Sequence, residues 1–402
     1  MTTSPDTPVP PISREERAQR AATVFNHLPP RTDAAVLFDD QFIQYYAGFA
    51  FHATERPIAL VILPGGERHL FVPRLEREHA QTFAETEQVV DYPEYPGETH
   101  PMEVLAAHLR ALGLGHARIG VDHDGYPAVM GYSGPPVSEV MPDAVVRRVS
   151  PHLDAQMALK SPAELALIRE SVRWGDHAHR LLQQYTQVGA SETDVEGQAT
   201  REATAAMVAA IGEQRRTPNR WLSGAVALYR GQIGAASALP HAMTSGVRFQ
   251  AGDTLVTGAG AGVGGYLSEL ERTMVMGEPS AEQRAFFAHM LALQDIAFEA
   301  LRPGATCASV DLAVLAYVDR EGLQPYWRHH VGHGLGQRIH EAPFLDRGDS
   351  RVLEPGMVLS VEPGLYVPGL GGFRHSDTIL ITASGMEILT SYPRALEDLV
   401  IP

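Results

Sequence analysis

The sequence predicts two domains: a small N-terminal α/β domain, followed by a larger α+β domain that contains an internal repeat. The chain has 402 residues, more than a single hydrophobic core usually serves. Its first part alternates short β-type and helical runs, and this texture changes near residue 160. Its second part contains two similar segments, at 188–195 and 303–310. We expect a disordered tail over 1–20, the α/β domain over 21–155 and the second domain over 156–402.

The composition is that of an ordinary globular protein, with 44% hydrophobic and 20% charged residues. A formal net charge of −16 argues against nucleic-acid and anionic-membrane partners, since both need a basic surface. The single cysteine, Cys307, can form neither an intramolecular disulfide nor a thiolate metal site. The polar, proline-rich start lacks the apolar core of a signal peptide, and no run approaches the ~20 apolar residues of a membrane helix. We therefore expect a cytoplasmic protein with no nucleic-acid or membrane partner.

Four β-type runs and one helix define the first domain. The runs are AAVLFDD, IALVILPGG, HLFVPRL and RIGVD. The segment MEVLAAHLRALGLG has helical periodicity and ends at Gly113 or Gly115. This domain shows no phosphate loop, and no residue in it indicates chemistry by itself.

A helix start opens the second domain. Ser161 is a candidate N-cap, Pro162 occupies the first helical position, and Glu164 completes a capping box. Downstream, VGASETDV and PGATCASV share a G-A-(S/T)-x-x-x-V frame, 303 − 188 = 115 residues apart, and each leads into a helix rich in Ala and Leu. Strand-like runs then close each half. We expect two similar halves around one site.

Two glutamates stand out in the strand-like run GYLSELERTMVMG at 265–277. Side chains two apart share a face of a strand, so Glu269, Glu271 and Thr273 point the same way. A solvated edge strand would explain this pattern in the simplest way. The glycine-rich run that precedes it makes a functional site the competing interpretation.

Further polar residues cluster in apolar, glycine-rich segments: HHVGHGLGQRIHEAP, VLSVEPGLY and GGFRHSDTIL. They contain His333, His340 and Glu362. The glycines around His333 indicate a loop or bent strand that closely approaches another segment. Glu362 lies in an apolar strand, where a buried carboxylate needs a cation or hydrogen-bond donors. Each residue alone has an ordinary structural explanation, but their clustering favours a functional site.

Five segments, PHAMTSGVRFQAGD, GYLSELERT, GHGLGQRIHEAP, LSVEPGLY and GFRHSDT, resemble the motifs of the pita-bread hydrolases. That superfamily includes Xaa-Pro dipeptidases (prolidases), aminopeptidase P, methionine aminopeptidase and creatinase. The resemblance covers the second domain closely, and the first domain suits the two-domain members. It implies a pita-bread fold with a pseudo-twofold repeat, a hydrolase activity and a homodimer.

The resemblance also implies a metal-ligand set that this sequence does not complete. The peptidases bind two divalent ions through Asp, Asp, His, Glu and Glu; the matching positions here are Gly258, Glu269, His333, Glu362 and Ser376. Glycine and serine cannot replace two anionic ligands, so a two-metal mechanism is not expected. One divalent ion (Mn, Zn or Co) on Glu269, His333 and Glu362 would leave the three carboxylates of the pocket, Glu271 included, at about −1, which slightly favours one metal. A metal-free site stays open.

Creatinase, the metal-independent member, supports that alternative. Glu271 matches a catalytic-site glutamate of creatinase where peptidases have threonine, and His241 matches its general acid/base histidine. Conversely, His340 and Pro343 match the peptidases. Arg374 corresponds to a residue that helps prolidases recognise the carboxyl end of the substrate.

We therefore expect a prolidase-like hydrolase of a C–N bond in a short peptide or small amide, with one divalent metal or none. The alternatives are a creatinase-like, metal-independent hydrolase of a small amidino or N-acyl compound, and a non-catalytic pita-bread protein that binds a peptide or partner. In the expected mechanism, His241 moves a proton to the leaving nitrogen, and Glu362 or Glu271 orients or deprotonates water. His340 and Arg374 hold the carbonyl and carboxylate of the substrate.

Overall fold

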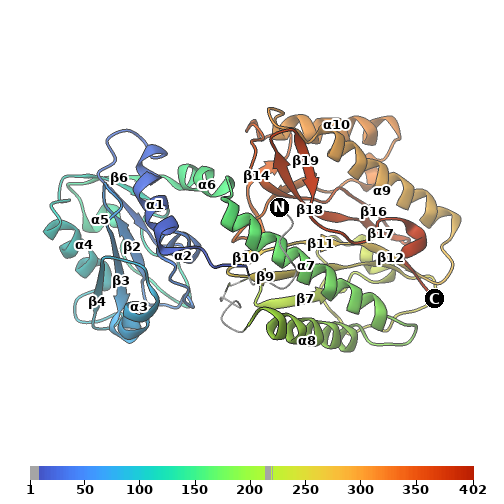
Figure 1. Cartoon of the computed structure of the whole chain (residues 1–402), viewed down its shortest axis with the longest axis horizontal. Helices are drawn as coiled ribbons and strands as arrows, with labels where there is room; N and C mark the ends of the chain where they lie inside the picture. The colour runs from blue at the N-terminus through green and yellow to red at the C-terminus, as the bar shows by residue number, and fades with distance from the viewer. Residues whose placement is uncertain (1–8, 213–218, 220) are drawn as a thin grey trace. The chain divides into compact units, whose positions relative to one another are not determined.

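The structure is a computed structural model that describes residues 9–212, 219 and 221–402 (Figure 1). The chain divides into two compact units: a first unit, Ile12–Met157, and a second unit, Ala158–Pro402, to which the described residues before Ile12 also belong. Among the described residues, none of the helices combines the length and the apolarity that crossing a membrane requires.

The start of the chain differs from the expected tail over 1–20. Helix α1 (Arg14–Thr23) begins behind Ser13, whose side chain accepts a hydrogen bond from the backbone N–H of Glu16. Ile12 is also buried. We overestimated the tail because its proline-rich composition continues up to the helix cap. Residues 1–8 of the predicted tail lie outside the described residues.

The first unit is a mixed six-stranded sheet, in the order β4-β3-β2-β1-β5-β6, with helices on both faces. All four predicted β-type runs contain a strand, and the predicted helix is present. The strands are β1 (Ala34–Leu37), β2 (Ala59–Ile62), β3 (Arg68–Pro73), β4 (Gln88–Tyr92), β5 (Arg118–Val121) and β6 (Val145–Arg148). The helices that follow α1 are α2 (Asp40–Ala47), α3 (Arg77–Phe83), α4 (Pro101–Ala111), α5 (Val137–Val140) and α6 (Ser150–Ala158).

The alternation of side chains along β1 explains why helices cover both faces of this sheet. Ala35 and Leu37 belong to a core that includes residues of α1 and α2, whereas Ala34 and Val36 belong to the core against α4. Successive side chains of a strand point to opposite faces, so a run that is apolar throughout needs helices on both sides.

The second unit contains the remaining elements. Its α-helices are α7 (Pro162–Tyr185), α8 (Glu192–Ile211), α9 (Ala281–Ala300) and α10 (Cys307–Arg320). Its strands are β7 (Gly224–Leu228), β8 (Thr254–Val256), β9 (Gly258–Val263), β10 (Tyr266–Leu267), β11 (Leu270–Glu271), β12 (Thr273–Met276), β13 (Gly332–Gly334), β14 (Glu341–Leu345), β15 (Val358–Val361), β16 (Gly364–Val367), β17 (Gly371–Arg374), β18 (Ser376–Thr382), β19 (Gly385–Ile388) and β20 (Val400–Ile401). Short 3₁₀ turns in the chain are η1 (Val24–Asn26), η2 (Arg74–Glu76), η4 (Gly234–Ala238), η5 (Gln324–Tyr326) and η6 (Leu396–Asp398).

An antiparallel sheet in the order β10-β9-β11-β18-β15-β13-β14 forms the centre of this unit, with β7 added to β9 and β19 to β18. Helices α7 and α8 pack on the β7–β9 part, and α9 and α10 form a second pair (Figure 1). The two repeated segments lie at the starts of α8 and α10, the second helix of each pair. The expected pair of similar halves is therefore visible in the helices.

The predicted start of α7 is confirmed. The Ser161 side chain accepts from the backbone N–H of Glu164, and the Glu164 side chain accepts from the N–H of Ser161, at 3.2 and 2.8 Å. The glycines around His333 do mark a close approach: a Cβ on Gly332 would lie 2.0 Å from the carbonyl oxygen of Ser360, and one on Gly334 2.7 Å from that of Ala342. β13 can pass between β14 and β15 only without side chains at these positions.

Candidate functional site

A pocket of about 870 Å³ opens in the second unit, where the predicted residues meet. His241, Glu269, Glu271, His340, Glu362 and Arg374 all line it; the other lining residues are Arg230, Pro240, Ala242, Met243, Thr244, Arg328, His329 and His330. His333 lies behind this wall, fully buried, and contacts two of the carboxylates. The structure thus brings together all seven site residues that we predicted.

The sheet order explains why residues far apart in sequence meet here. Glu271 ends β11, His333 lies in β13, and Glu362 directly follows β15; with β18 these strands are neighbours in the sheet. The alternation of strand side chains sends Arg272 away from the pocket. Its guanidinium donates to Asp377 at 2.8 Å and to four backbone carbonyls, so its role is structural.

Glu269, His333 and Glu362 form one polar group at the pocket wall. His333 Nε2 lies 3.2 Å from Oε1 of Glu362 and 3.7 Å from Oε2 of Glu269, and its Nδ1 faces the carbonyl oxygen of Gly334 at 3.0 Å. Burial opposes the charge on His333, but the close contact with Glu362 and the charges of the two carboxylates prevail and raise its pKa to about 9. Burial works against ionisation of Glu362 as well, yet His333 and Arg374 hold its pKa well below the usual range.

Glu269 behaves in the opposite way. Its Oε2 is buried and accepts no hydrogen bond from any described residue. Burial raises its pKa to about 8, although the positive charge of His333 opposes this shift; the neighbouring charges of Glu362 and Glu271 add to it. A carboxyl group that faces a pocket and titrates near neutrality is suited to proton transfer.

His340 stacks on His333, with ring centroids 3.8 Å apart and an interplanar angle of 18°. Desolvation in this stack, together with the positive charge of His333, lowers the pKa of His340 to about 4. His340 is therefore neutral at pH 7 and can act as an acceptor or a neutral donor toward a molecule in the pocket.

Glu271 is held by two guanidinium groups. Its Oε1 accepts from Nη2 of Arg374 at 2.7 Å and from Nη2 of Arg230, and its Oε2 is ion-paired with Nε of Arg374. Nη1 of Arg374 donates to the hydroxyl of Tyr366 at 2.8 Å. Arg374 lines the pocket as expected, but most of its donors serve Glu271 and Tyr366.

Sequence reasoning missed Arg230. It follows β7 in the left-handed backbone conformation, with φ of 55°, which is uncommon outside glycine and often marks functional sites. Nη2 also donates to Oε1 of the buried Gln232 at 3.1 Å. The side chain is 40% exposed, and its Nε and Nη1 make no hydrogen bond to described residues. An arginine next to glycine, directly after an apolar strand, is the signal that could have indicated it.

Two glutamates of α8 shape the loops that carry Arg230 and His241. Oε1 of Glu196 accepts from the backbone N–H of Arg230 at 3.2 Å. Glu192 is fully buried and accepts from the N–H groups of Gly231 and of Gly246, the latter at 3.1 Å. The first helical residues of a repeated segment therefore fix one wall of the pocket.

The residues present do not suit two metal ions. Ser376 is fully buried, and its hydroxyl is hydrogen-bonded to that of Ser360 at 2.7 Å. A Cβ on Gly258 would lie 3.2–3.3 Å from the guanidinium atoms of Arg230, so that guanidinium covers the place of a side chain there. Two groups still have ligand atoms within 4.8 Å of one another: Glu269, His333 and His340, and Glu269, Glu271 and Glu362. The charge balance predicted from sequence omitted Arg230 and Arg374, and with them it no longer favours a metal.

A smaller apolar hollow of about 220 Å³ adjoins the pocket and shares Arg230, Glu269, Glu271 and His340 with it. Its other lining residues are mainly apolar: Trp221, Leu222, Val226, Leu228, Gly258, Ala259, Gly260, Ser268 and Ile339. The site can therefore take a molecule with both a polar and an apolar part.

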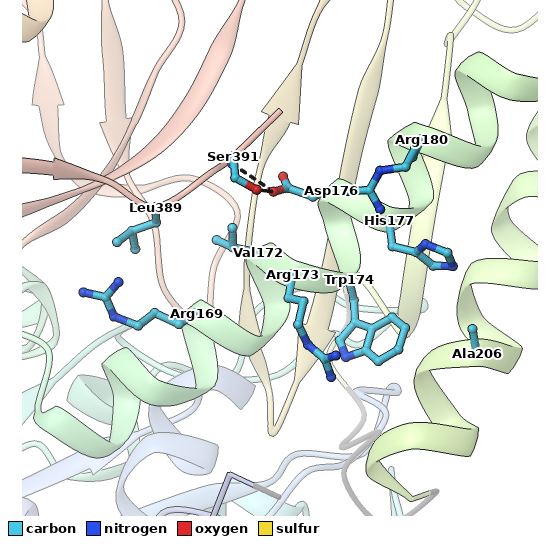
Figure 2. A pocket seen from close by; sticks show the side chains of 10 residues that line it. All are labelled: Arg169, Val172, Arg173, Trp174, Asp176, His177, Arg180, Ala206, Leu389 and Ser391. Carbon is cyan, nitrogen blue, oxygen red and sulfur yellow. Dashed lines mark hydrogen bonds between the residues drawn. The ribbon is translucent and has the colours of Figure 1, made fainter. Parts of the chain in front are cut away.

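A second pocket, of about 480 Å³, lies along α7 (Figure 2). Figure 2 shows its arginines, and Asp176 accepting from the backbone N–H and hydroxyl of Ser391. Arg169 is paired with Glu387 at 2.6 and 2.8 Å, and Arg173 lies over the ring of Trp174 while bound to Glu170. Its cations are largely engaged, and it lacks the grouped carboxyl and imidazole groups of the first pocket.

Comparison with known proteins matches both units. The model of metallopeptidase family M24 matches residues 166–383, and that of the creatinase/prolidase N-terminal domain matches residues 30–134. An Xaa-Pro dipeptidase of Pyrococcus furiosus is 41% identical over 163 residues, which are 40% of this chain and 47% of that protein; the match thus spans about half the relative's length.

Solved structures are similar over nearly the whole chain. Dipeptidase PepE from Mycobacterium ulcerans has a TM-score of 0.79 and 26% identity, and the match covers 97% of this chain and 98% of that one. An Xaa-Pro dipeptidase from Bacillus anthracis has a TM-score of 0.77 and 25% identity, over 96% and 100% of the two chains. The predicted two-domain pita-bread fold is confirmed.

Proposed function

Because the chain belongs to metallopeptidase family M24, we propose that its carboxylate-lined pocket hydrolyses a C–N bond in a short peptide or small amide. Xaa-Pro dipeptides are the first substrate class to consider, since the relatives include Xaa-Pro dipeptidases. The observation that carries the proposal is Glu269: a buried carboxyl group with a pKa of about 8, whose Oε2 accepts no hydrogen bond from a described residue, facing a pocket lined by three arginines and several histidines.

We assign the general base to Glu269 rather than to Glu271 or Glu362. Both oxygens of Glu271 are engaged by guanidinium groups, and Glu362 is held ionised by His333. The lowered pKa of Glu362 makes it a poor proton acceptor, and the guanidinium groups contact both oxygens of Glu271. Oε2 of Glu269 accepts no hydrogen bond from a described residue, and this carboxylate can take a proton from a water that attacks the substrate carbonyl carbon. His333 Nε2, 3.7 Å from Oε2, stabilises the carboxylate form.

His241 protonates the leaving nitrogen. It is exposed at the pocket wall, on the loop that Glu192 fixes, and imidazole is the side chain best suited to give a proton near pH 7. His340, neutral at pH 7, lies on the same wall and contacts the substrate carbonyl oxygen as that oxygen gains charge.

The substrate carries a carboxylate and an apolar group. Arg230 keeps Nε and Nη1 for the carboxylate, since among the described residues only its Nη2 is engaged. The apolar hollow beside Trp221 adjoins Arg230 and accepts an aliphatic or proline-like ring. This assigns to Arg230 the carboxylate recognition that the family resemblance suggested for Arg374.

A creatinase-like reaction on a small amidino or N-acyl compound is the second candidate. The feature that favours it is the incomplete ligand set at Gly258 and Ser376, together with a glutamate at position 271. The same base and proton donor serve either substrate, so the two candidates differ in the bound molecule and not in the catalytic groups.

A substrate panel tests the proposal: Xaa-Pro dipeptides, other dipeptides, N-acyl amino acids and creatine, with products identified by mass spectrometry. We expect one class to be cleaved, and Glu269→Gln to lower kcat by about 10²–10⁴-fold while the variant remains folded. The matched control is Glu387→Gln, which changes a paired glutamate beside the second pocket and should leave turnover unchanged. A wild type that binds panel members without cleaving any would favour the non-catalytic interpretation.

We further propose a cytoplasmic location and a homodimeric state. The first is supported by the single cysteine, since disulfide-free chains suit a reducing compartment, and the second by family resemblance. Size-exclusion chromatography with light scattering tests the dimer directly.

A further inference from the structure

The guanidinium of Arg230 lies where the ligand set is incomplete. Its Cζ, Nη1 and Nη2 are 3.2–3.3 Å from the position of a Cβ on Gly258. Gly258 is the position at which the family resemblance calls for an anionic ligand. The guanidinium therefore occupies the space into which the side chain of such a ligand would extend. An anionic side chain at 258 would meet a cation that is already in place.

Arg230 is also fixed in a way that a merely solvated arginine is not. Its backbone has a positive φ, its N–H donates to Glu196, and its Nη2 donates to both Gln232 and Glu271. Gln232 is fully buried, and its Oε1 also lies 3.5 Å from Nη2 of Arg374. A buried amide and a buried carboxylate therefore hold two guanidinium groups together over one site.

The charge balance of the pocket also argues against a divalent ion at this place. Glu269, Glu271 and Glu362 contribute at most three negative charges, and the lining arginines Arg230, Arg328 and Arg374 contribute three positive ones, which leaves no net negative charge. A divalent ion placed beside these guanidinium groups would be repelled by them, and in a partly buried site such repulsion is poorly screened.

We propose that the Arg230 guanidinium takes the place of a divalent metal ion, so that the pocket carries its own fixed cation and binds no divalent metal. This inference rests on the same pocket as the proposed function and deepens it. It assigns the activating positive charge to a residue of the chain, next to Glu269 and the apolar hollow.

Calorimetric titration of the chelator-treated, full-length protein with Mn²⁺ alone tests the proposal without a substrate. Wild type should bind no stoichiometric Mn²⁺. Arg230→Met removes the charge but keeps an extended side chain, and it should bind one Mn²⁺ per chain, more than about tenfold more tightly than wild type. Arg230→Lys keeps the charge and should behave like wild type. Arg169→Met, which breaks the pair between Arg169 of α7 and Glu387 of β19, is the matched control and should gain no metal.

A restored ligand set provides a second test. Gly258→Asp, Glu269→Asp and Ser376→Glu together should gain little metal while Arg230 is present, because the new aspartate pairs with it. Adding Arg230→Ser should then allow binding. Each variant is first checked for folding by circular dichroism and thermal unfolding.

One stoichiometric Mn²⁺ in wild type, lost in Glu269→Gln, would overturn the proposal, as would a folded Arg230→Met variant that binds no better than wild type. If Arg230→Met does not fold, the proposal is tested by the Mn²⁺ titrations of the wild type and of the variants with the restored ligand set. If no panel compound is cleaved but the Mn²⁺ titrations give the expected results, only the proposed hydrolase function is rejected. If the wild type cleaves a substrate but binds stoichiometric metal, only the present inference is rejected.

Discussion

Glu269 and Glu271 have the same side chain, two positions apart and both buried, yet their surroundings give them different chemistry. Two guanidinium groups pair with Glu271, whereas Glu269 faces the imidazole of His333 at 3.7 Å. Strand alternation predicts from sequence that both side chains face the same way. It cannot predict which one is neutralised, because Arg230 comes from the turn that follows β7 and Arg374 from β17. This is why we first assigned the base to Glu271 or Glu362.

The pH dependence of turnover follows from two groups at this scale. Glu269 must be ionised to accept a proton, so kcat/KM should rise with pH up to about 8. His333 stabilises that carboxylate only while protonated, so activity should fall as pH rises through about 9. We expect a narrow, bell-shaped pH profile of kcat/KM with its maximum between these two pKa values, measured with the substrate identified in the panel. A profile that rises near pH 4.5 and stays flat to pH 10 would contradict the assignment to Glu269.

At the scale of elements, local patterns were sufficient where the determinants lie close in sequence. The capping box of α7, the strands of the first unit and the glycines of β13 were all predicted from short segments. The tail was predicted too long because composition does not reveal where a cap begins. By contrast, the contacts among the site residues depend on the order of the strands in the sheet, which short segments do not reveal. The ion pair between Lys160, the only lysine of the chain, and Glu341 in β14 likewise joins segments far apart in the sequence.

That ion pair yields a stability prediction. The side chains of Lys160 and Glu341 are 1% and 4% exposed, so Glu341→Ala leaves a buried ammonium without its counter-charge. We expect a loss of about 3–5 kcal/mol in the free energy of unfolding, and recovery of much of it in Lys160→Met with Glu341→Leu. Denaturant unfolding measures both. The control, Glu278→Ala, removes an exposed pair with Arg284 and should cost about 0–1 kcal/mol; equal losses in both single variants would contradict the account.

At the scale of the whole molecule, the family and the pita-bread fold could be predicted from sequence, because five short motifs in order specify them. The site residues that belong to those motifs also converge in one pocket. Arg230 lies outside the motifs, and its importance comes from a left-handed turn and from the space left by Gly258. A departure from a family pattern shows what is missing in the sequence, but only the structure shows what fills the gap.

The central claim is that this pocket hydrolyses its substrate with groups of the chain alone. The most direct measurement is turnover of the panel's best substrate by chelator-treated, full-length protein, with metal content determined by elemental analysis of the same sample. We predict undiminished kcat/KM with far less than one metal ion per chain, and no stimulation by Mn²⁺, Zn²⁺ or Co²⁺. Activity that disappears on chelation and returns in proportion to bound metal would contradict the claim.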